Sequence, residues 1–138
     1  MKGCVVFVVV KGMPGHEEDI AMVQEKNKPT PKLWKLAGGT KENGEFLEAT
    51  AYREIHEELG IVLKALSEDD IIYRAELNGK YGSYDFVLFE GRYYSGAIQI
   101  GSEIERIEFF TKNQIAEMIK NKQIVKNHAL ALKSYLNL

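Results

Sequence analysis

The residues best suited to chemistry are three glutamates that lie within five positions of one another. Glu54, Glu57 and Glu58 stand in a run that ends at Gly60. An α-helix turns by about 100° per residue, so Glu58 falls at about +40° and Glu57 at about −60° from Glu54. The three carboxylates therefore share one arc. Oxygen-rich clusters without Cys or His suit Mg²⁺, Mn²⁺ or Ca²⁺ better than zinc, and the stretch predicts a site for a hard divalent cation.

A helix over Glu45–Leu59 must hold these carboxylates. Ala, Leu and Glu dominate it, and Gly60 is typical of a left-handed helix stop. Apolar residues fall on a separate arc, which predicts one packing face and one acidic face. Gly38 and Gly39 precede the helix and would let the backbone approach a ligand closely, with a carbonyl oxygen as a further ligand. A solvated acidic helix face is the alternative, and spacing alone leaves both interpretations open.

The remaining pattern predicts strands, then this helix, then more strands and two terminal helices. We expect the first two strands to form a hairpin, and the Asn78–Gly82 segment to turn between two others. The expected strands are Val5–Val10, Ile20–Gln24, Val62–Leu66, Ile71–Leu77, Ser83–Tyr94, Ile98–Ile100 and Ile107–Phe110, and the expected terminal helices are Lys112–Lys120, capped by Thr111, and His128–Leu136. Because strands and helices do not alternate, this order predicts an α/β domain with a mixed sheet instead of a doubly wound fold.

Composition excludes several classes of function. The 138 residues are 45% hydrophobic and 28% charged, with a formal net charge of −2, as expected for a single globular domain over residues 1–138. Without a basic surplus, neither a nucleic acid polymer nor an anionic membrane is an expected partner. Cys4 is the single cysteine, so a disulfide within the chain is impossible. The apolar run Cys4–Val10 is too short to span a membrane, and we expect a cytoplasmic protein.

The stretch from Gly39 to Ile61 resembles a complete Nudix box. That pattern is G-x5-E-x7-R-E-U-x-E-E-x-G-U, where U is a bulky apolar residue. Gly39, Glu45 and the run Arg53–Ile61 match every fixed position. The signature covers 23 of the 138 residues. Ala37 departs from the family, in which many members have proline before the glycines, but it removes no chemical group.

The resemblance implies a Nudix fold, an α/β/α sandwich around a mixed β-sheet, with hydrolysis that depends on Mg²⁺ or Mn²⁺. It implies a pair between Arg53 and Glu45 that orients the catalytic carboxylates, with Glu54 favoured as the base that accepts the proton of the attacking water. The implied metal ligands are the Gly38 carbonyl, Glu54, Glu57 and Glu58, joined by a glutamate from a downstream loop, for which Glu103 is favoured over Glu105.

The implied substrate is a small nucleotide, a nucleoside diphosphate linked to another group. The compact chain favours a nucleoside triphosphate that yields monophosphate and pyrophosphate. Alternative substrates are dinucleoside polyphosphates and nucleotide sugars, and the alternative function is a catalytically silent nucleotide sensor. A homodimer is also possible. Two groups of side chains have two open interpretations. Tyr81, Tyr84 and Phe86 could stack on a base or pack in the core, and Lys26, Lys28 and Lys32 could bind phosphate or lie in a solvated loop. We expect Trp34 in the core, and His56 and His128 in surface or packing roles.

Overall fold

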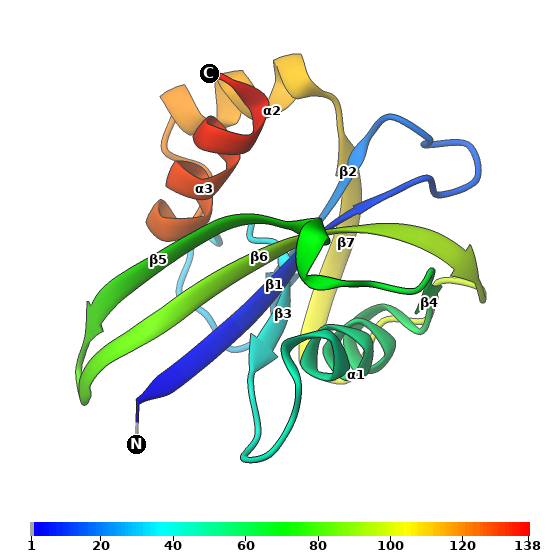
Figure 1. The fold of residues 1–138 in the computed structure, drawn as a ribbon. Helices are drawn as coiled ribbons and strands as arrows, with labels where there is room; N and C mark the ends of the chain where they lie inside the picture. The colour runs from blue at the N-terminus through cyan, green and yellow to red at the C-terminus, as the bar shows by residue number, and fades with distance from the viewer. Residues whose placement is uncertain (1) are drawn as a thin grey trace.

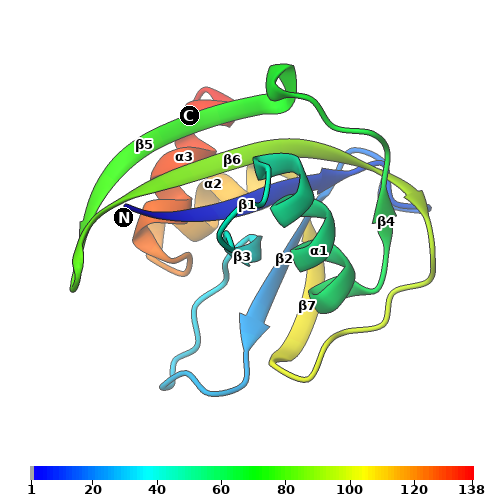
Figure 2. The same ribbon diagram turned by 60° about the horizontal axis from the view of Figure 1, so that its bottom comes forward.

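The computed structural model of the protein describes residues 2–138 and consists of two sheets with helices on both sides (Figures 1 and 2). The strands are β1 (Gly3–Lys11), β2 (Ile20–Glu25), β3 (Ala37–Thr40), β4 (Val62–Leu63), β5 (Ile71–Gly79), β6 (Gly82–Ser95) and β7 (Ile104–Phe110). The helices are α1 (Leu47–Leu59), the 3₁₀ turn η1 (Glu68–Asp70), α2 (Lys112–Lys120) and α3 (Lys126–Leu136). The predicted α/β class with a mixed sheet is confirmed.

Strand β1 is the centre of the larger sheet. It pairs parallel with β6 and antiparallel with β3, and β6 also pairs with β4 and β5. Val6 and Val8 belong to one apolar cluster, and Phe7 and Val9 belong to a second cluster on the opposite face. Because both faces are covered, the strand reads as a continuous apolar run.

The expected hairpin between the first two strands is wrong. β1 already has β3 on one edge and β6 on the other, so neither edge is left for β2. β2 pairs instead with β7, antiparallel, as a separate two-stranded sheet. Apolar runs reveal strands but not their partners. Ile98–Ile100 is also not a strand, since the backbone N–H of Gln99 donates to the carbonyl of Leu59 at the end of α1.

The predicted hairpin between β5 and β6 is confirmed, but its turn lies two residues later than the Asn-Gly signal. Gly79 pairs with Gly82, which puts Lys80 and Tyr81 at the tip. Both strands extend farther than their apolar patterns, and the tip projects from the body of the protein (Figure 1). It thus comes to flank a cavity described below.

Helix α1 lies on one side of the larger sheet, and α2 and α3 lie on the other (Figure 2). Ala51, Ile55 and Leu59 of α1 are fully buried, and Gly60 ends the helix with φ 77°, as predicted. The Thr111 cap of α2 is also confirmed, since its hydroxyl accepts the N–H of Gln114. The remaining face of α1 meets β3, where the glycine pair lies.

Two further expectations can be compared with the structure. Trp34 is buried at 8% exposure, in contact with the ring of Phe110, which confirms its place in the core. Within residues 2–138, no helix is long and apolar enough to cross a membrane.

Candidate active site

Arg53 is the organising side chain of the α1 surface. Its Nε and Nη2 atoms donate to the two carboxylate oxygens of Glu45, at 2.8 and 3.0 Å. Its Nη1 donates to Oε1 of Glu54 at 2.9 Å, and Nη2 also reaches the carbonyl of Thr40 at 3.0 Å. Such a two-pronged pair fixes both partners in orientation as well as in distance. The Arg53–Glu45 pair that the resemblance implied is therefore present, and it extends to Glu54.

Glu45 is held as a permanent anion. Arg53 lowers the pKa of its carboxyl group to about 2, helped by the backbone N–H of Glu42 and the hydroxyl of Thr50. The two additional donors lie 2.8 and 2.9 Å from Oε1. Thr50 is itself fully buried under this network. A carboxylate so fully hydrogen-bonded cannot act as a base near neutral pH, so Glu45 is suited to orientation.

Glu58 is the most buried of the three box glutamates. Only 9% of it is exposed, and its Oε1 accepts the backbone N–H of Gly38 at 3.0 Å. Burial raises the pKa of its carboxyl group to about 7, an effect that the Gly38 N–H and the charge of Lys35 oppose. An ionised carboxylate here would be stabilised by a cation. The N–H of Gly38 is thus engaged with Glu58, while the role of its carbonyl as a metal ligand stays a prediction.

The glycine pair lets the backbone of β3 approach β1 at Gly38 and the Glu54 side chain of α1 at Gly39. A Cβ atom added to Gly39 would lie 2.6 Å from the carboxyl carbon of Glu54, and one added to Gly38 would lie 2.1 Å from the carbonyl oxygen of Val6. Gly38, with φ +151°, therefore requires glycine, whereas a side chain at Gly39 would displace the carboxyl group of Glu54. Burial raises the pKa of Glu54, while Arg53 acts in the opposite direction.

A cavity of about 320 Å³ lies beside these carboxylates. It is lined by Glu54, Glu57, Glu58, Gly101, Ser102, Glu103 and Ile104, and we call it the acidic cavity. Glu103 reaches it from the loop before β7. Glu105 instead forms an ion pair with Lys32 at 2.8 Å, so the structure separates the two downstream glutamates. The ligand role of Glu103 remains a prediction.

The donor chemistry of the acidic cavity suits a hard divalent cation, since all four titratable groups in its lining are carboxylates. Their positions are not yet convergent: within residues 2–138, no three His, Cys, Asp or Glu side chains lie close enough to hold a metal ion. Glu54 is tied to Arg53 and Glu58 to Gly38, whereas Glu57 and Glu103 are exposed. Among the described residues, Glu57 has only a long ion pair, 3.6 Å, with Arg53, so these exposed side chains can turn toward a cation and the residues fit one.

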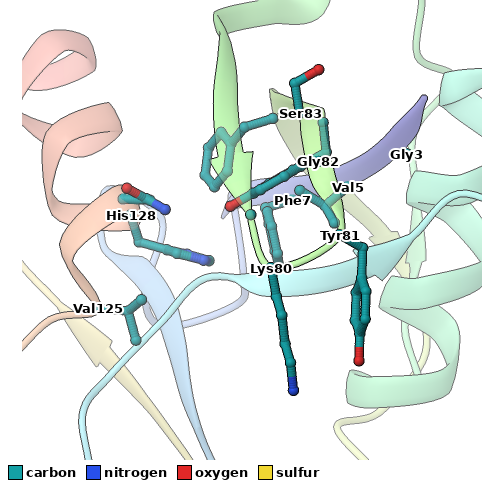
Figure 3. Close-up of a pocket in the computed structure, with 13 residues that line it drawn as sticks. Gly3, Val5, Phe7, Lys80, Tyr81, Gly82, Ser83, Val125 and His128 are labelled. Carbon is teal, nitrogen blue, oxygen red and sulfur yellow. The ribbon is translucent and has the colours of Figure 1, made fainter.

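A larger cavity, of about 590 Å³, lies between β1, the β5–β6 hairpin and the start of α3. Figure 3 shows Val125 and His128 on one side of it and Gly3, Gly82 and Tyr81 on the other, with Phe7 between them. We call it the aromatic cavity, because Phe7, Tyr81, Tyr84, Phe86 and His128 contribute to its lining. The three aromatic residues with two open interpretations thus all border it, although Phe86 is also in the core at 2% exposure.

His128 is a neutral packing residue at the wall of this cavity. Its Nδ1 accepts the backbone N–H of Leu36 at 3.1 Å, and its ring lies 4.3 Å from that of Phe7. Burial lowers its pKa to about 3. His56, in contrast, is exposed on α1. Sequence patterns did not indicate the cavity, because its walls come from segments that are far apart in the chain.

A third cavity, of about 360 Å³, shares Val125 and His128 with the aromatic cavity. We call it the lysine cavity, and the rest of its lining is Glu25, Lys28, Pro29, Pro31, Leu33 and Lys35. Of the three loop lysines considered for phosphate binding, Lys28 borders this cavity and Lys32 is paired with Glu105. Lys35 was missed, since it stands within an apolar segment beside Trp34.

The comparison with known protein families decides the identity of the chain. A model of the NUDIX domain matches residues 1–133. The chain belongs to the Nudix family. The predicted enzyme class, a Nudix pyrophosphohydrolase, is thereby confirmed, and Nudix hydrolases generally use divalent metal ions.

Relatives support this assignment. The chain is 27% identical over 122 residues to the ADP-ribose pyrophosphatase of Methanocaldococcus jannaschii, covering 88% of this chain and 72% of that protein. It is 36% identical over 69 residues to nucleoside diphosphate-linked moiety X motif 6 of Xenopus laevis, over 50% of this chain and 31% of that protein. The solved NUDIX hydrolase of Nitrosomonas europaea superposes with a TM-score of 0.77 at 17% identity, covering 98% of this chain and 88% of its own. This last likeness confirms the Nudix fold.

Proposed function

We propose that the protein hydrolyses the diphosphate linkage of a nucleoside diphosphate derivative, with Mg²⁺ or Mn²⁺ held by Glu54, Glu57, Glu58 and Glu103. The observation that carries this proposal is the acidic cavity, where carboxylates from α1 and from the loop before β7 line one space. The Gly38 carbonyl is a further oxygen available on β3. A divalent ion bound there would neutralise phosphate charge and lower the pKa of water that attacks phosphorus.

The residues around Arg53 would position the base. Glu45 keeps Arg53 in place through two hydrogen bonds, and Arg53 in turn holds Oε1 of Glu54 at 2.9 Å. Glu54 would then accept a proton from the attacking water. Partial burial raises its pKa and so increases its proton affinity, as a general base requires. Glu57 is freer and more exposed, which suits a ligand that moves to meet the ion.

The aromatic cavity is the place that we propose for the nucleoside. Its volume of about 590 Å³ lies within the range of roughly 300–1,000 Å³ for small-molecule sites. Phe7 and Tyr84 offer apolar surface to a base, and the neutral ring of His128 adds no charge there. Phe7 pairs in register with Gly38, whose N–H holds Glu58, so the aromatic and acidic cavities flank one strand pair.

Two substrate types share the required nucleoside diphosphate unit. The compact chain favours nucleoside triphosphates, while the name of the Methanocaldococcus jannaschii relative favours ADP-ribose. A hydrolysis screen separates them. The purified protein is incubated with triphosphates, ADP-ribose, dinucleoside polyphosphates and nucleotide sugars, with Mg²⁺, with Mn²⁺ and with a chelator, and products are separated by chromatography.

We expect metal-dependent release of a nucleoside monophosphate, lost in Glu57→Gln and retained in Glu48→Gln. Glu48 is on the same helix but outside the lining of the acidic cavity, so it is a matched control. Activity that survives the chelator would contradict the proposal. Thermal stabilisation by a nucleotide without hydrolysis of any compound would instead indicate a nucleotide sensor.

A further inference from the structure

Lys35 lines the lysine cavity, which shares Val125 and His128 with the aromatic cavity. Its backbone is fixed by a bridge to β2: the N–H of Val23 donates to the carbonyl of Lys35 at 2.8 Å, and the reverse bond is 3.0 Å long. Its side chain lines the lysine cavity and is only 15% exposed. A lysine that is mostly withdrawn from water at a cavity wall needs a reason, since burying a charge is unfavourable without a partner.

The ammonium group of Lys35 lies against the wall of the aromatic cavity. Lys35 Nζ is 5.0 Å from the centre of the Phe7 ring, and Phe7 lines the aromatic cavity. Phe7 is the register partner of Gly38, whose N–H donates to Glu58 in the acidic cavity. β3 is an edge strand of the larger sheet and Lys35 stands two residues before it, so a substrate that reaches round this edge from the aromatic cavity to the acidic cavity would come close to the ammonium.

The ammonium also has bonding capacity to spare. Its ionic partner is Oε1 of Glu25 at 3.5 Å, which is longer than the roughly 2.7–2.9 Å of a strong charge-assisted bond. An ammonium has three N–H donors. Lys32 offers an instructive contrast: it is equally exposed at 15%, but lies 2.8 Å from Glu105 and 2.8 Å from the carbonyl of Lys26. Lys32 is satisfied by the protein, whereas within residues 2–138 Lys35 has only its longer contact with Glu25.

We propose that Lys35 binds the phosphate that joins the nucleoside to the reacting diphosphate, exchanging its long contact with Glu25 for a phosphate oxygen. This inference rests on the proposed function, because it needs a nucleotide that extends from the aromatic cavity to the acidic cavity. It adds a cation to a site in which the titratable residues of the acidic cavity are all glutamates. Lys35 is thus a binding residue for the substrate anion, and its positive charge would add to that of a metal held by the carboxylates.

A purely structural role would predict a different pattern. If Lys35 only neutralised Glu25, removing either member of the ion pair would have the same consequence, and if it only packed on Phe7, neither change would alter the contribution of a phosphate to binding. If it binds phosphate, Glu25 competes with the ligand for the same ammonium. Glu25→Gln should then leave phosphate binding intact or strengthen it, while Lys35→Met should weaken it. The two substitutions therefore act in opposite directions only under the proposal.

The test is calorimetric binding, in Mg²⁺, of AMP, GMP, CMP and UMP and of their parent nucleosides. The ratio of nucleoside Kd to monophosphate Kd reports the phosphate contribution alone, and a partial loss of folded protein cancels in it. We expect Lys35→Met to reduce this ratio roughly 10- to 100-fold, as the loss of a charge-assisted bond implies. Lys35→Arg should retain part of it, and Lys32→Met should leave it unchanged.

An unchanged ratio in Lys35→Met, or an equal loss in Glu25→Gln, would overturn the inference while leaving the proposed function intact. If the wild-type protein binds none of the four monophosphates, the nucleotide assignment fails and the inference fails with it. Circular dichroism of each variant shows that it is folded, and Lys35→Gln replaces Lys35→Met if the latter does not fold.

Discussion

The acidic cavity and the aromatic cavity lie on either side of the Phe7–Gly38 pair, yet they are built in different ways. The acidic cavity is lined by two short stretches, Glu54 to Glu58 of α1 and Gly101–Ile104 at the start of β7, and Arg53 holds Glu54 by a short polar contact. The aromatic cavity is assembled by packing of β1, the β5–β6 hairpin and the start of α3. The first is suited to a reaction and the second to selection of a substrate. Changes in the first should therefore alter turnover, and changes in the second should alter affinity.

The largest effect is expected from the base. Glu54→Gln keeps the volume of the side chain but removes its negative charge and its ability to take a proton. We expect kcat to fall by roughly 10²–10⁴-fold, the usual contribution of general base catalysis, with little change in thermal stability. Steady-state kinetics on the substrate that the screen identifies will measure this. A variant with nearly full kcat would assign the proton transfer to another group.

Arg53→Met tests the positioning network one step farther from the reaction. Its loss releases Glu54 and leaves Glu45 without its guanidinium partner. We expect a fall of roughly 10- to 100-fold in kcat, as is typical for residues that orient metal or catalytic ligands. KM should change less than kcat. A change confined to KM would place Arg53 in substrate binding and break the division between the two regions.

The pH dependence of stability tests the packing of the aromatic cavity. His128 has a folded pKa of about 3, below its ordinary unfolded value of about 6.5, so below pH 6.5 the unfolded chain binds a proton that the folded protein does not. Its contribution to stability is therefore present above pH 6.5 and is lost as pH falls. Between pH 7 and pH 5 it should decline by about 2 kcal/mol.

Urea unfolding of the wild type and of His128→Asn at the two pH values measures this effect. The raised pKa of Glu58 acts in the opposite direction, because the folded protein then binds the additional proton. Only the difference between wild type and variant isolates the histidine. If both proteins lose the same stability between pH 7 and pH 5, His128 is not buried in its neutral form.

The smallest effect is expected from Tyr84→Ala. Tyr84 is half-buried at the wall of the aromatic cavity. Loss of one aromatic contact with a base should raise KM about tenfold, since such stacking contributes roughly 1–3 kcal/mol. We expect kcat to stay nearly constant. A selective loss of kcat would show that this region takes part in the reaction, and Tyr94→Ala, an exposed residue outside the cavity lining, is the control.

Local signals in the sequence predicted much of the fold and of the acidic cavity. The periodicity of α1, its stop at Gly60 and the Thr111 cap each depend on residues within a few positions, and all three are confirmed. The carboxylates of the box are also close in sequence, so their common face followed from helical geometry. The pairing of Arg53 with Glu45 was implied by the family pattern alone. The two residues are eight positions apart, one in a loop and one on a helix, and that separation does not by itself define a contact.

Long-range pairing could not be predicted in this way. β2 is as apolar as β1, and nothing in either segment indicates that β2 pairs with β7. The aromatic cavity depends on another long-range pairing, that of β1 with β6, and on the packing of α3 against these strands. Lys35 was missed because it stands in an apolar segment beside Trp34, and its position over Phe7 depends on the pairing of the following strand, β3, with β1.

The account depends on the acidic cavity being a metal site, although its carboxylates do not converge in the described residues 2–138. The most direct measurement is electron paramagnetic resonance during a titration with Mn²⁺. The account predicts saturable binding in the wild type, weakened at least tenfold in Glu57→Gln and unchanged in Glu48→Gln. Absence of binding in the wild type, or equal affinity in Glu57→Gln, would contradict it.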